Sequence, residues 1–331
     1  MDAIAIKLAL DKIVALFVVG GKMAQYVTRL SGGASQETWA FDVVDGGDQT
    51  QSLILRRCPI EGPRNGEAIG LATEAALISA AQVAGVAVPE VRYVCQAEDG
   101  LGDAFIMNFV AGETVARKIL RDTTYKNARE TLAAQCGTAL AKIHAMTCDV
   151  VLPTSDGPDQ LRRYHDIYRG FQVNRPVIEL AFQWLTNAAP KPVAMSMVHG
   201  DFRNGNLIVG EDGLRAVLDW ELAHRGDPRE DLGWICVNSW RFGVANKQVG
   251  GFGDLQHMLD AYEKAGGQRY DIADIKWFQA LGSLKWAIMC LIMYHAFETG
   301  ADPSIERAMI GRRTSEAEMD LLNLMERRKH A

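Results

Sequence analysis

The chain has 331 residues, enough to bury a large core or two lobes. Its formal net charge of −6, with 35 Lys and Arg against 41 Asp and Glu, argues against nucleic acid as a partner. None of the six cysteines belongs to a Cys-x-x-Cys pair, so neither a zinc site nor a disulfide framework is predicted. That cysteine usage is typical of a cytoplasmic protein.

The first predicted element is an amphipathic helix over residues 4–18, on the outside of a first lobe. It contains an apolar run from Ile13 to Val19, which is too short to cross a bilayer. Asp11 and Lys12 interrupt the larger apolar stretch, and no basic segment precedes it as in a signal peptide. We therefore expect no membrane-spanning segment and no membrane partner.

Two predicted strands, at 26–30 and 38–43, flank a turn of small residues. The turn contains Ser31, Gly32, Gly33, Ala34 and Ser35. Glycines let a backbone approach phosphates, and free N–H groups can bind them, so the turn is a candidate nucleotide lid. No Gly-Lys-Ser/Thr follows, so it is not a Walker A motif, and a Gly-Gly hairpin alone is more often only a hairpin.

A third strand is predicted at 52–57 and ends in two arginines. Period-2 alternation turns Arg56 to the same inner side as Ile54, although a strand-end cation in solvent is the alternative. A helix is predicted over 67–85, because its apolar residues recur three and four apart.

Three further elements are predicted before the main motif. Residues 86–91 read as the start of a strand. An apolar strand from 104 runs into an irregular segment that ends at Gly112. Residues 127–145 form a strongly periodic helix, with His144 at its end.

The segment from Val198 to Glu221 carries the chemistry. Asp201 is followed five residues later by Asn206, and Asp219 comes thirteen residues after that. Two short apolar strands around the turn at 210–213 predict a hairpin, which returns Asp219 beside Asn206. Phosphoryl transfer needs a carboxylate to orient the attacking hydroxyl and oxygen ligands to hold magnesium against the phosphates.

These residues resemble the aminoglycoside phosphotransferase family. The resemblance rests on His199-Gly200-Asp201 with Asn206, on Asp219-Trp220-Glu221, and on the run Gly226-Asp227-Pro228 with Asp231-Leu232. It implies an α+β, bilobal protein-kinase-like fold with an N-terminal antiparallel sheet lobe and a mainly helical C-terminal lobe. The expected division is a nucleotide-binding lobe at 1–106, a hinge at 107–112, and a helical lobe with catalytic loop and acceptor site at 113–331.

The resemblance also implies roles for the motif residues. Asp201 is the expected catalytic residue, and Asn206 and Asp219 are the expected Mg²⁺ ligands. Backbone groups of the hinge are expected to bind the adenine of ATP, with GTP as an alternative. These hinge groups belong to Met107, Asn108 and Phe109.

Kinase-like folds place a Lys where this chain has Arg56, and a helical Glu steadies that cation. Arg56 is therefore expected to contact the phosphates, paired with Glu74, with Glu67 as the rival partner. The Arg resembles a branch of the family that includes kinase-like domains linked to acyl-CoA metabolism. His199 and Asp231 are expected to support the catalytic loop structurally. His144 is expected to be a packing or capping residue, not a base.

The C-terminal third is less informative about the acceptor. From residue 241 to 331 the chain has twelve acidic and twelve basic residues, a balance that does not predict an acidic cleft for polycationic aminoglycosides. Aromatic and Met residues at helical spacing predict a helix core, with an acceptor groove as the alternative. They are Trp277, Phe278, Trp286, Met289, Met293, Tyr294 and Phe297. Three arginines, Arg307, Arg312 and Arg313, are expected to face solvent, the alternative being an anionic substrate tail.

The predicted function is transfer of the γ-phosphate of ATP, with Mg²⁺, to a hydroxyl of a small molecule, with a hydroxylated acyl compound as a candidate. One alternative is an aminoglycoside or other antibiotic kinase. A second is a pseudokinase that binds nucleotide without turnover. The intact set of Asp201, Asn206 and Asp219 argues against the pseudokinase.

Overall fold

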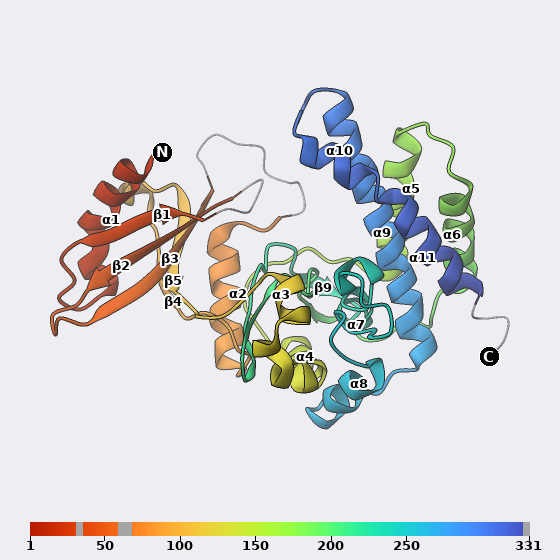
Figure 1. Cartoon of the computed structure of the whole chain (residues 1–331), viewed down its shortest axis with the longest axis horizontal. Helices are drawn as coiled ribbons and strands as arrows, with labels where there is room; N and C mark the ends of the chain where they lie inside the picture. Colours follow the sequence, from red (N-terminus) through yellow and green to blue (C-terminus); the bar gives the residue numbers. More distant parts are fainter. Residues whose placement is uncertain (31–35, 59–67, 327–331) are drawn as a thin grey trace.

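The computed structural model describes residues 1–30, 36–58 and 68–326. It has two lobes, an N-terminal sheet lobe and a larger, mainly helical C-terminal lobe (Figure 1). The architecture is therefore the α+β class that the sequence predicts.

The N-terminal lobe is built on a five-stranded antiparallel sheet with strand order β1-β2-β3-β5-β4. Its strands are β1 (Ala24–Arg29), β2 (Glu37–Val44), β3 (Thr50–Cys58), β4 (Val91–Val94) and β5 (Asp103–Asn108). Helix α1 (Ala3–Phe17) packs on one face, and α2 (Leu71–Val83) packs on the other. The alternation of β3 explains this, because Leu53 and Leu55 join the α1 core while Ile54 joins the α2 core.

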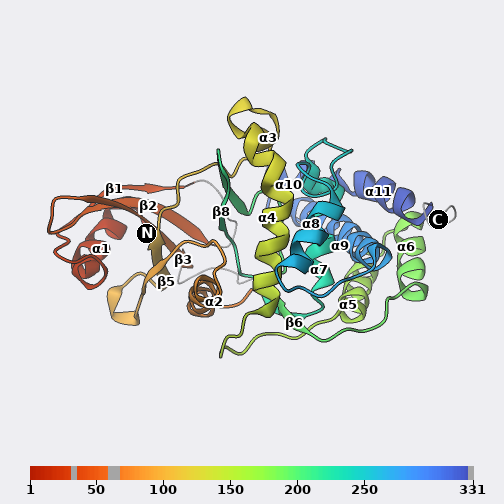
Figure 2. The same ribbon diagram turned by 90° about the horizontal axis from the view of Figure 1, so that it is seen from below.

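The C-terminal lobe contains nine α-helices in the described ranges. They are α3 (Ala116–Arg121), α4 (Lys126–Ala145), α5 (Gly157–Gly170), α6 (Pro176–Asn187), α7 (Arg229–Trp234), α8 (Leu255–Lys264), α9 (Ile272–Glu298), α10 (Ile305–Gly311) and α11 (Thr314–Glu326). Two small antiparallel pairs complete the lobe: β6 (Ser196–Val198) with β9 (His224–Gly226), and β7 (Leu207–Gly210) with β8 (Gly213–Val217). Figure 2 shows α4 running across the middle of the molecule, between the sheet lobe and the remaining helices.

Two apolar cores organise these helices. The first is shared between the lobes, since it joins Ile54 and Phe105 of the sheet to Leu140 of α4 and Met258 of α8. The second gathers α5, α6, α7, α9 and α11 around residues such as Trp277 and Leu284. The segment from Val198 to Glu221 lies against the first core through Phe202 and Trp220, so a closely packed interior supports it.

Most predicted elements are confirmed to within a few residues, but one strand is wrong. Residues 86–90 belong to no strand, and β4 begins only at Val91. Pro89 lacks the N–H that a ladder bond requires, and the Ala87 carbonyl accepts from Val217 of the C-terminal lobe instead. Helix α2 is also shorter than the predicted 67–85.

Helix α9 contains most of the aromatic residues whose role the sequence left open. Trp277, Phe278 and Trp286 are buried in the second core, which confirms the core interpretation for them. In the described ranges α9 is the one helix long and apolar enough to span a membrane, and 61% of its most apolar window is buried inside the protein. That burial is typical of the core helix of a globular domain.

Candidate active site

The catalytic loop begins where β6 ends. Gly200 takes a φ of +81°, and a Cβ there would lie 2.4 Å from the carbonyl oxygen of Leu222. Only glycine fits this turn. The turn presents Asp201, and Asn206 follows just before β7 begins.

The Asp201 carboxylate is held by N–H donors on several sides. Asn206 Nδ2 donates to Oδ2 (2.6 Å), and Trp234 Nε1 donates to Oδ1 (2.8 Å). Arg203 Nε lies between the two oxygens, at 3.0 and 3.2 Å. The side chain is 14% exposed. The carboxylate is therefore fixed in one orientation while one edge still reaches solvent.

The predicted hairpin brings Asp219 beside Asn206. Leu207 pairs with Val217 across β7 and β8, and the Leu218 N–H donates to the Asn206 carbonyl (2.8 Å). Asp219 then takes a φ of +66°, which costs a non-glycine residue about 1 kcal/mol or more. A strained backbone at this position is typical of a functional site.

Arg56 connects the two lobes at this point. Its Nη2 donates to Asp219 Oδ1 (3.1 Å), and its Nη1 lies 3.3 Å from Glu74 Oε1 on α2. Glu74 is fully buried. Burial, with the charges of Asp219 and Glu221, raises the pKa of Glu74 to about 7, although Arg56 opposes the shift. The predicted register of β3 is correct, since neighbouring Arg57 points away, to the Leu101 carbonyl and Glu37.

Two further side chains complete this cluster. The sequence argument expected Gln36 only as the end of the loop that covers the phosphates, and it gave Glu221 no role. Gln36 Oε1 accepts from Arg56, and Gln36 Nε2 donates to Glu221 Oε2 (3.0 Å). Burial and the charge of Asp219 raise the pKa of Glu221 to about 7. Glu221 stands in the quoted Asp-Trp-Glu motif, so its spacing from Asp219 was the available signal. Gln36 had none, because its partners are 20 and 185 residues away.

The charge balance here fits a bound cation. Glu74, Asp219 and Glu221 share Arg56 as their nearby positive charge, so a divalent cation would relieve their repulsion. The described ranges contain no group of three or more His, Cys, Asp or Glu arranged as an all-protein metal cage. Mg²⁺ does not need one, because it binds through one or two protein oxygens together with phosphates and water. Asn206 commits Nδ2 to Asp201, which leaves Oδ1 as its cation-binding atom.

A buried network anchors the catalytic loop from below. Asp231 accepts from the N–H of His199 (2.8 Å) and of Gly200 (3.0 Å), and His144 Nε2 lies 3.2 Å from its Oδ2. Tyr262 holds His144 Nδ1 at 2.8 Å. Although burial opposes ionisation of Asp231, the hydrogen bond and charge of His144 keep its pKa below the usual range.

His199 ties the catalytic loop to the Asp219 segment. Its Nε2 donates to the Leu218 carbonyl (3.1 Å), and its Nδ1 accepts from the Asp201 N–H (3.2 Å). Burial lowers the pKa of His199, so the neutral imidazole is favoured. Both ring nitrogens are engaged with the backbone. Both His199 and His144 therefore contact groups that hold the loop.

The hinge differs in one respect from the expectation. Met107 is buried and lies between β3 and β4 in the sheet, but the Asn108 N–H donates to the Glu90 carbonyl and the Phe109 N–H to the Ser52 carbonyl. These two donors are therefore engaged within the sheet. The next N–H, of Val110, donates to no other backbone group in the described part of the chain.

Some predicted residues cannot be placed. Ser31, Gly32, Gly33, Ala34 and Ser35 lie outside the described residues, and so does Glu67. Gln36 follows that turn in the sequence and is described, and its side chain contacts Arg56. The expectation of a nucleotide lid therefore stays a prediction.

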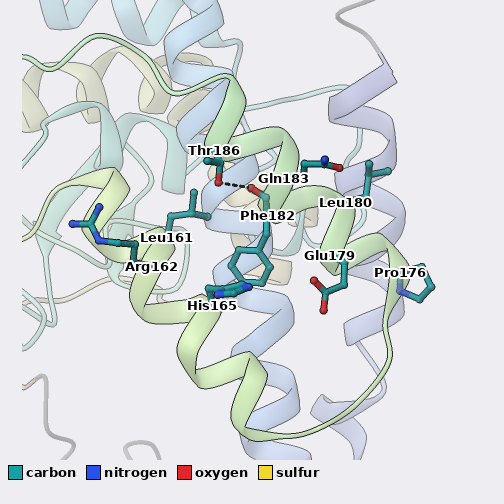
Figure 3. A pocket seen from close by; sticks show the side chains of 9 residues that line it. All are labelled: Leu161, Arg162, His165, Pro176, Glu179, Leu180, Phe182, Gln183 and Thr186. Atoms are coloured by element: carbon teal, nitrogen blue, oxygen red, sulfur yellow. Dashed lines mark hydrogen bonds between the residues drawn. The ribbon is translucent and has the colours of Figure 1, made fainter.

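A cleft on the described surface lies elsewhere. It has a volume of about 730 Å³ between α5 and α6, and Figure 3 shows Leu161, His165 and Phe182 facing it. Neither Asp201, Asn206 nor Asp219 lines it. Its size alone therefore does not connect it with the chemistry of the Asp201 site.

Comparisons with known proteins agree with this geometry. A model of the phosphotransferase enzyme family matches residues 27–267. The chain belongs to this family. Among curated proteins, it is 28% identical over 214 residues to mouse (Mus musculus) acyl-CoA dehydrogenase family member 10. That match covers 62% of this chain but spans only about a fifth (20%) of the relative's length.

Solved structures share the fold. A candidate aminoglycoside phosphotransferase of Ralstonia eutropha JMP134 superposes with a TM-score of 0.74 at 23% identity, over 96% of this phosphotransferase-family chain and 98% of that one. Aminoglycoside phosphotransferase APH(4)-Ia, in a complex with AMP-PNP and hygromycin B, gives a TM-score of 0.58 at 16% identity, over 94% and 98%. The bilobal kinase-like fold is therefore confirmed.

Proposed function

We propose that this chain is an ATP- and Mg²⁺-dependent phosphotransferase that moves the γ-phosphate to a hydroxyl of a small molecule. The observation that carries the proposal is the meeting of Asp201, Asn206 and Asp219 with Arg56 at one point between the lobes. Family membership and the nucleotide analogue bound to a structural relative support it.

Asp201 is the catalytic residue of the proposal. The acceptor oxygen forms a bond to the γ-phosphorus, the bond from that phosphorus to the β–γ bridging oxygen breaks, and ADP leaves. The hydroxyl proton passes to the Asp201 carboxylate and then to solvent. The carboxylate can accept it because its side chain is 14% exposed.

The phosphates would be bound from both lobes. Arg56 supplies a fixed positive charge, steadied by Glu74, and the turn at 31–35 is proposed to cover the phosphates. Asn206 and Asp219 would hold Mg²⁺. When bound, this ion neutralises charge on the phosphates. Catalysis would then rest mainly on positioning and on charge stabilisation.

The adenine would bind at the hinge. We divide the chain as the sequence suggested, into a nucleotide lobe at 1–106, a hinge at 107–112 and a catalytic and acceptor lobe at 113–331. Since the N–H groups of Asn108 and Phe109 are engaged, the Asn108 carbonyl and the Val110 N–H are the proposed partners of the base. Met107 would line the inner wall of the pocket.

The finer part of the proposal is the acceptor, a hydroxylated acyl compound. The relative named acyl-CoA dehydrogenase family member 10 supports an acyl substrate. Arg56, in a position where drug-resistance enzymes mostly have Lys, supports the same branch. The even charge of residues 241–331 disfavours a polycationic antibiotic.

The test is magnesium-dependent release of ADP from ATP. The full chain is assayed against hydroxy acids, hydroxyacyl thioesters, sugars and aminoglycosides, with Asp201→Asn as the matched inactive variant. Turnover with a hydroxyacyl compound, lost in the variant, is the expected result. Turnover only with aminoglycosides would contradict the acyl acceptor and support an antibiotic kinase. Binding of Mg-AMP-PNP without any turnover would favour the pseudokinase, and absence of nucleotide binding would overturn the whole proposal.

A further inference from the structure

Helix α9 carries a buried cation that the proposed chemistry does not use. This cation is Lys285, whose side chain is only 11% exposed. Its chain neighbours Leu284 and Trp286 belong to the second apolar core. Burial of an ammonium group in such surroundings is costly unless the charge is paired, so the partners of Lys285 decide how it is tolerated.

The first partner of Lys285 is Glu230, in the first turn of α7. Lys285 Nζ lies 3.6 Å from Glu230 Oε1. The other oxygen, Oε2, accepts from Gln160 Nε2 (2.6 Å) and from His224 Nε2 (3.1 Å). Helix α7 packs against α9 (Figure 1), so the ion pair joins two helices inside the C-terminal lobe.

The group around Glu230 keeps a surplus of positive charge. His224 Nδ1 faces the Leu222 carbonyl (3.0 Å) while Nε2 faces the carboxylate, so both ring nitrogens act as donors and the imidazolium is favoured. Although burial opposes both shifts, the pair of opposite charges raises the pKa of His224 and lowers the pKa of Glu230. Two cations, His224 and Lys285, therefore surround one carboxylate.

The second partner of Lys285 is the indole ring of Trp234. Glu230 and Trp234 are four residues apart on α7, so they share one face of that helix. Lys285 Nζ lies 5.1 Å from the centroid of the Trp234 ring, within the range of a cation–π contact. Gly282, one turn earlier on α9, makes room for the ring, since a Cβ there would lie 2.9 Å from Trp234 Cε3. The indole is therefore held against α9.

The N–H of the same indole reaches the catalytic loop. Trp234 Nε1 donates to Asp201 Oδ1 at 2.8 Å. A cation at the face of the ring polarises it and makes this N–H a stronger donor. Although burial opposes it, three nearby acidic groups raise the pKa of Lys285: Tyr164, Glu230 and Asp201. The amine is therefore charged, and its charge acts on Asp201.

We propose that Lys285 is a positioning residue for Asp201: its ammonium group, held by Glu230, strengthens and orients the hydrogen bond from Trp234 to the catalytic carboxylate. This inference rests on the proposed function only in naming Asp201 as the group that accepts the hydroxyl proton. The alternative is a buried ion pair that only joins α7 to α9. That alternative predicts a change in stability without a change in the bond between Trp234 and Asp201.

NMR of the seven tryptophan indole N–H signals tests the coupling in the full chain without any acceptor. The Trp234 signal is the one that Trp234→Phe removes. It should move upfield in Asp201→Asn, because the charged hydrogen-bond acceptor is lost, and also in Lys285→Met, which removes the ammonium but keeps much of the side-chain volume. If the two residues act on one bond, the shift caused by Lys285→Met should be less than about half as large in the Asp201→Asn background.

Turnover with the acceptor identified by the ADP-release assay is the second readout. We expect kcat to fall about tenfold in Lys285→Met and about 30-fold in Trp234→Phe, with KM for ATP and Mg-AMP-PNP affinity within about twofold of the wild type. Lys285→Met combined with Glu230→Gln leaves no stranded carboxylate, so it should be more stable than Lys285→Met alone while kcat stays low. The matched control is Lys276→Met, which changes an exposed lysine of the same helix and should alter neither readout.

Three outcomes would overturn the positioning role. One is a Trp234 signal that does not respond to Asp201→Asn, a result that needs no Lys285 variant to fold. Another is a shift from Lys285→Met of equal size in the wild type and in the Asp201→Asn background. The third is full kcat in Lys285→Met with only stability reduced, which would make Lys285 a structural residue. If the wild type neither binds Mg-AMP-PNP nor turns over any acceptor, the proposed function is overturned, and the NMR comparison still decides whether Lys285 acts on Asp201 through Trp234.

Discussion

The two sides of Asp201 are built in different ways. The interlobe side, formed by Arg56, Glu74, Asp219 and Glu221, draws its groups from both lobes and gathers three carboxylates around one guanidinium. The indole side, formed by Arg203 and Trp234, comes entirely from the C-terminal lobe. Its polar groups surrounding Asp201 are donors.

That difference has a physical consequence. The geometry of the interlobe side depends on the relative position of the two lobes. Its carboxylates outnumber its cations, so a bound cation would reduce their mutual repulsion. The indole side and the loop beneath it are supported by a packed core and by the Asp231 network, so they are formed before any ligand binds. Substitutions on the two sides should therefore change different observables.

The largest effect is expected at the residue that both sides share. Asp201→Asn should lower kcat for ADP release about 10³-fold, because the proton acceptor is lost while the shape is kept. The thermal midpoint and Mg-AMP-PNP affinity should stay near those of the wild type. Residual turnover within tenfold of the wild type would remove Asp201 from the mechanism.

The contribution of Asp231 to the support of the catalytic loop should be measurable as a change in the free energy of unfolding. Asp231→Asn places an amide among the N–H groups of His199 and Gly200, so the free energy of unfolding should fall by about 3 kcal/mol. Denaturant unfolding measures this. Asp212→Asn, at an exposed hairpin turn, is the matched control and should change stability by less than about 0.5 kcal/mol. Equal effects in both variants would contradict the anchoring role.

Substitutions of the adjacent residues Arg56 and Arg57 should distinguish an effect on catalysis from an effect on stability. Arg56→Gln should lower kcat/KM for ATP about 100-fold, while Arg56→Lys should lose less than tenfold because the charge remains. Arg57→Gln should leave kcat/KM nearly unchanged but reduce stability by about 2 kcal/mol, since Arg57 is buried against the Leu101 carbonyl and Glu37. The reverse pattern in steady-state kinetics and denaturation would mean that the register of β3 is wrong.

The smallest expected effect is the pH dependence of Glu74. Its folded pKa of about 7 lies above the ordinary value of 4.5, so the folded state holds the proton more tightly than the unfolded state. The stabilisation from that proton is complete below about pH 4.5 and is lost as the pH rises through about 7. Relative to Glu74→Gln, the wild type should lose about 2 kcal/mol of unfolding free energy between about pH 5 and about pH 8. Denaturation curves at the two pH values measure it, and a difference independent of pH would show that Glu74 is already ionised at the lower pH.

The sequence predicted correctly those features that are set by short-range geometry along the chain. The fold class followed from motif order, and the Asp219–Asn206 contact followed from a hairpin whose strands and turn are local. The inward direction of Arg56 followed from strand alternation. The free backbone groups of the hinge were harder to predict from the sequence, because the neighbouring strands β3 and β4 decide which N–H groups of β5 are hydrogen-bonded. The late start of β4, at Val91, was missed for the same reason.

By itself, then, the sequence determined the phosphotransferase-like motif and its three residues at fixed spacing along the chain, Asp201, Asn206 and Asp219. Only the tertiary structure decided which distant side chains meet them. Trp234 reaches Asp201 across 33 residues, and Arg56 reaches Asp219 across 163. Helix periods and hairpin turns set local geometry over a few residues, whereas such contacts depend on how whole elements pack. The charge and shape of the indole side therefore became visible only in the folded chain.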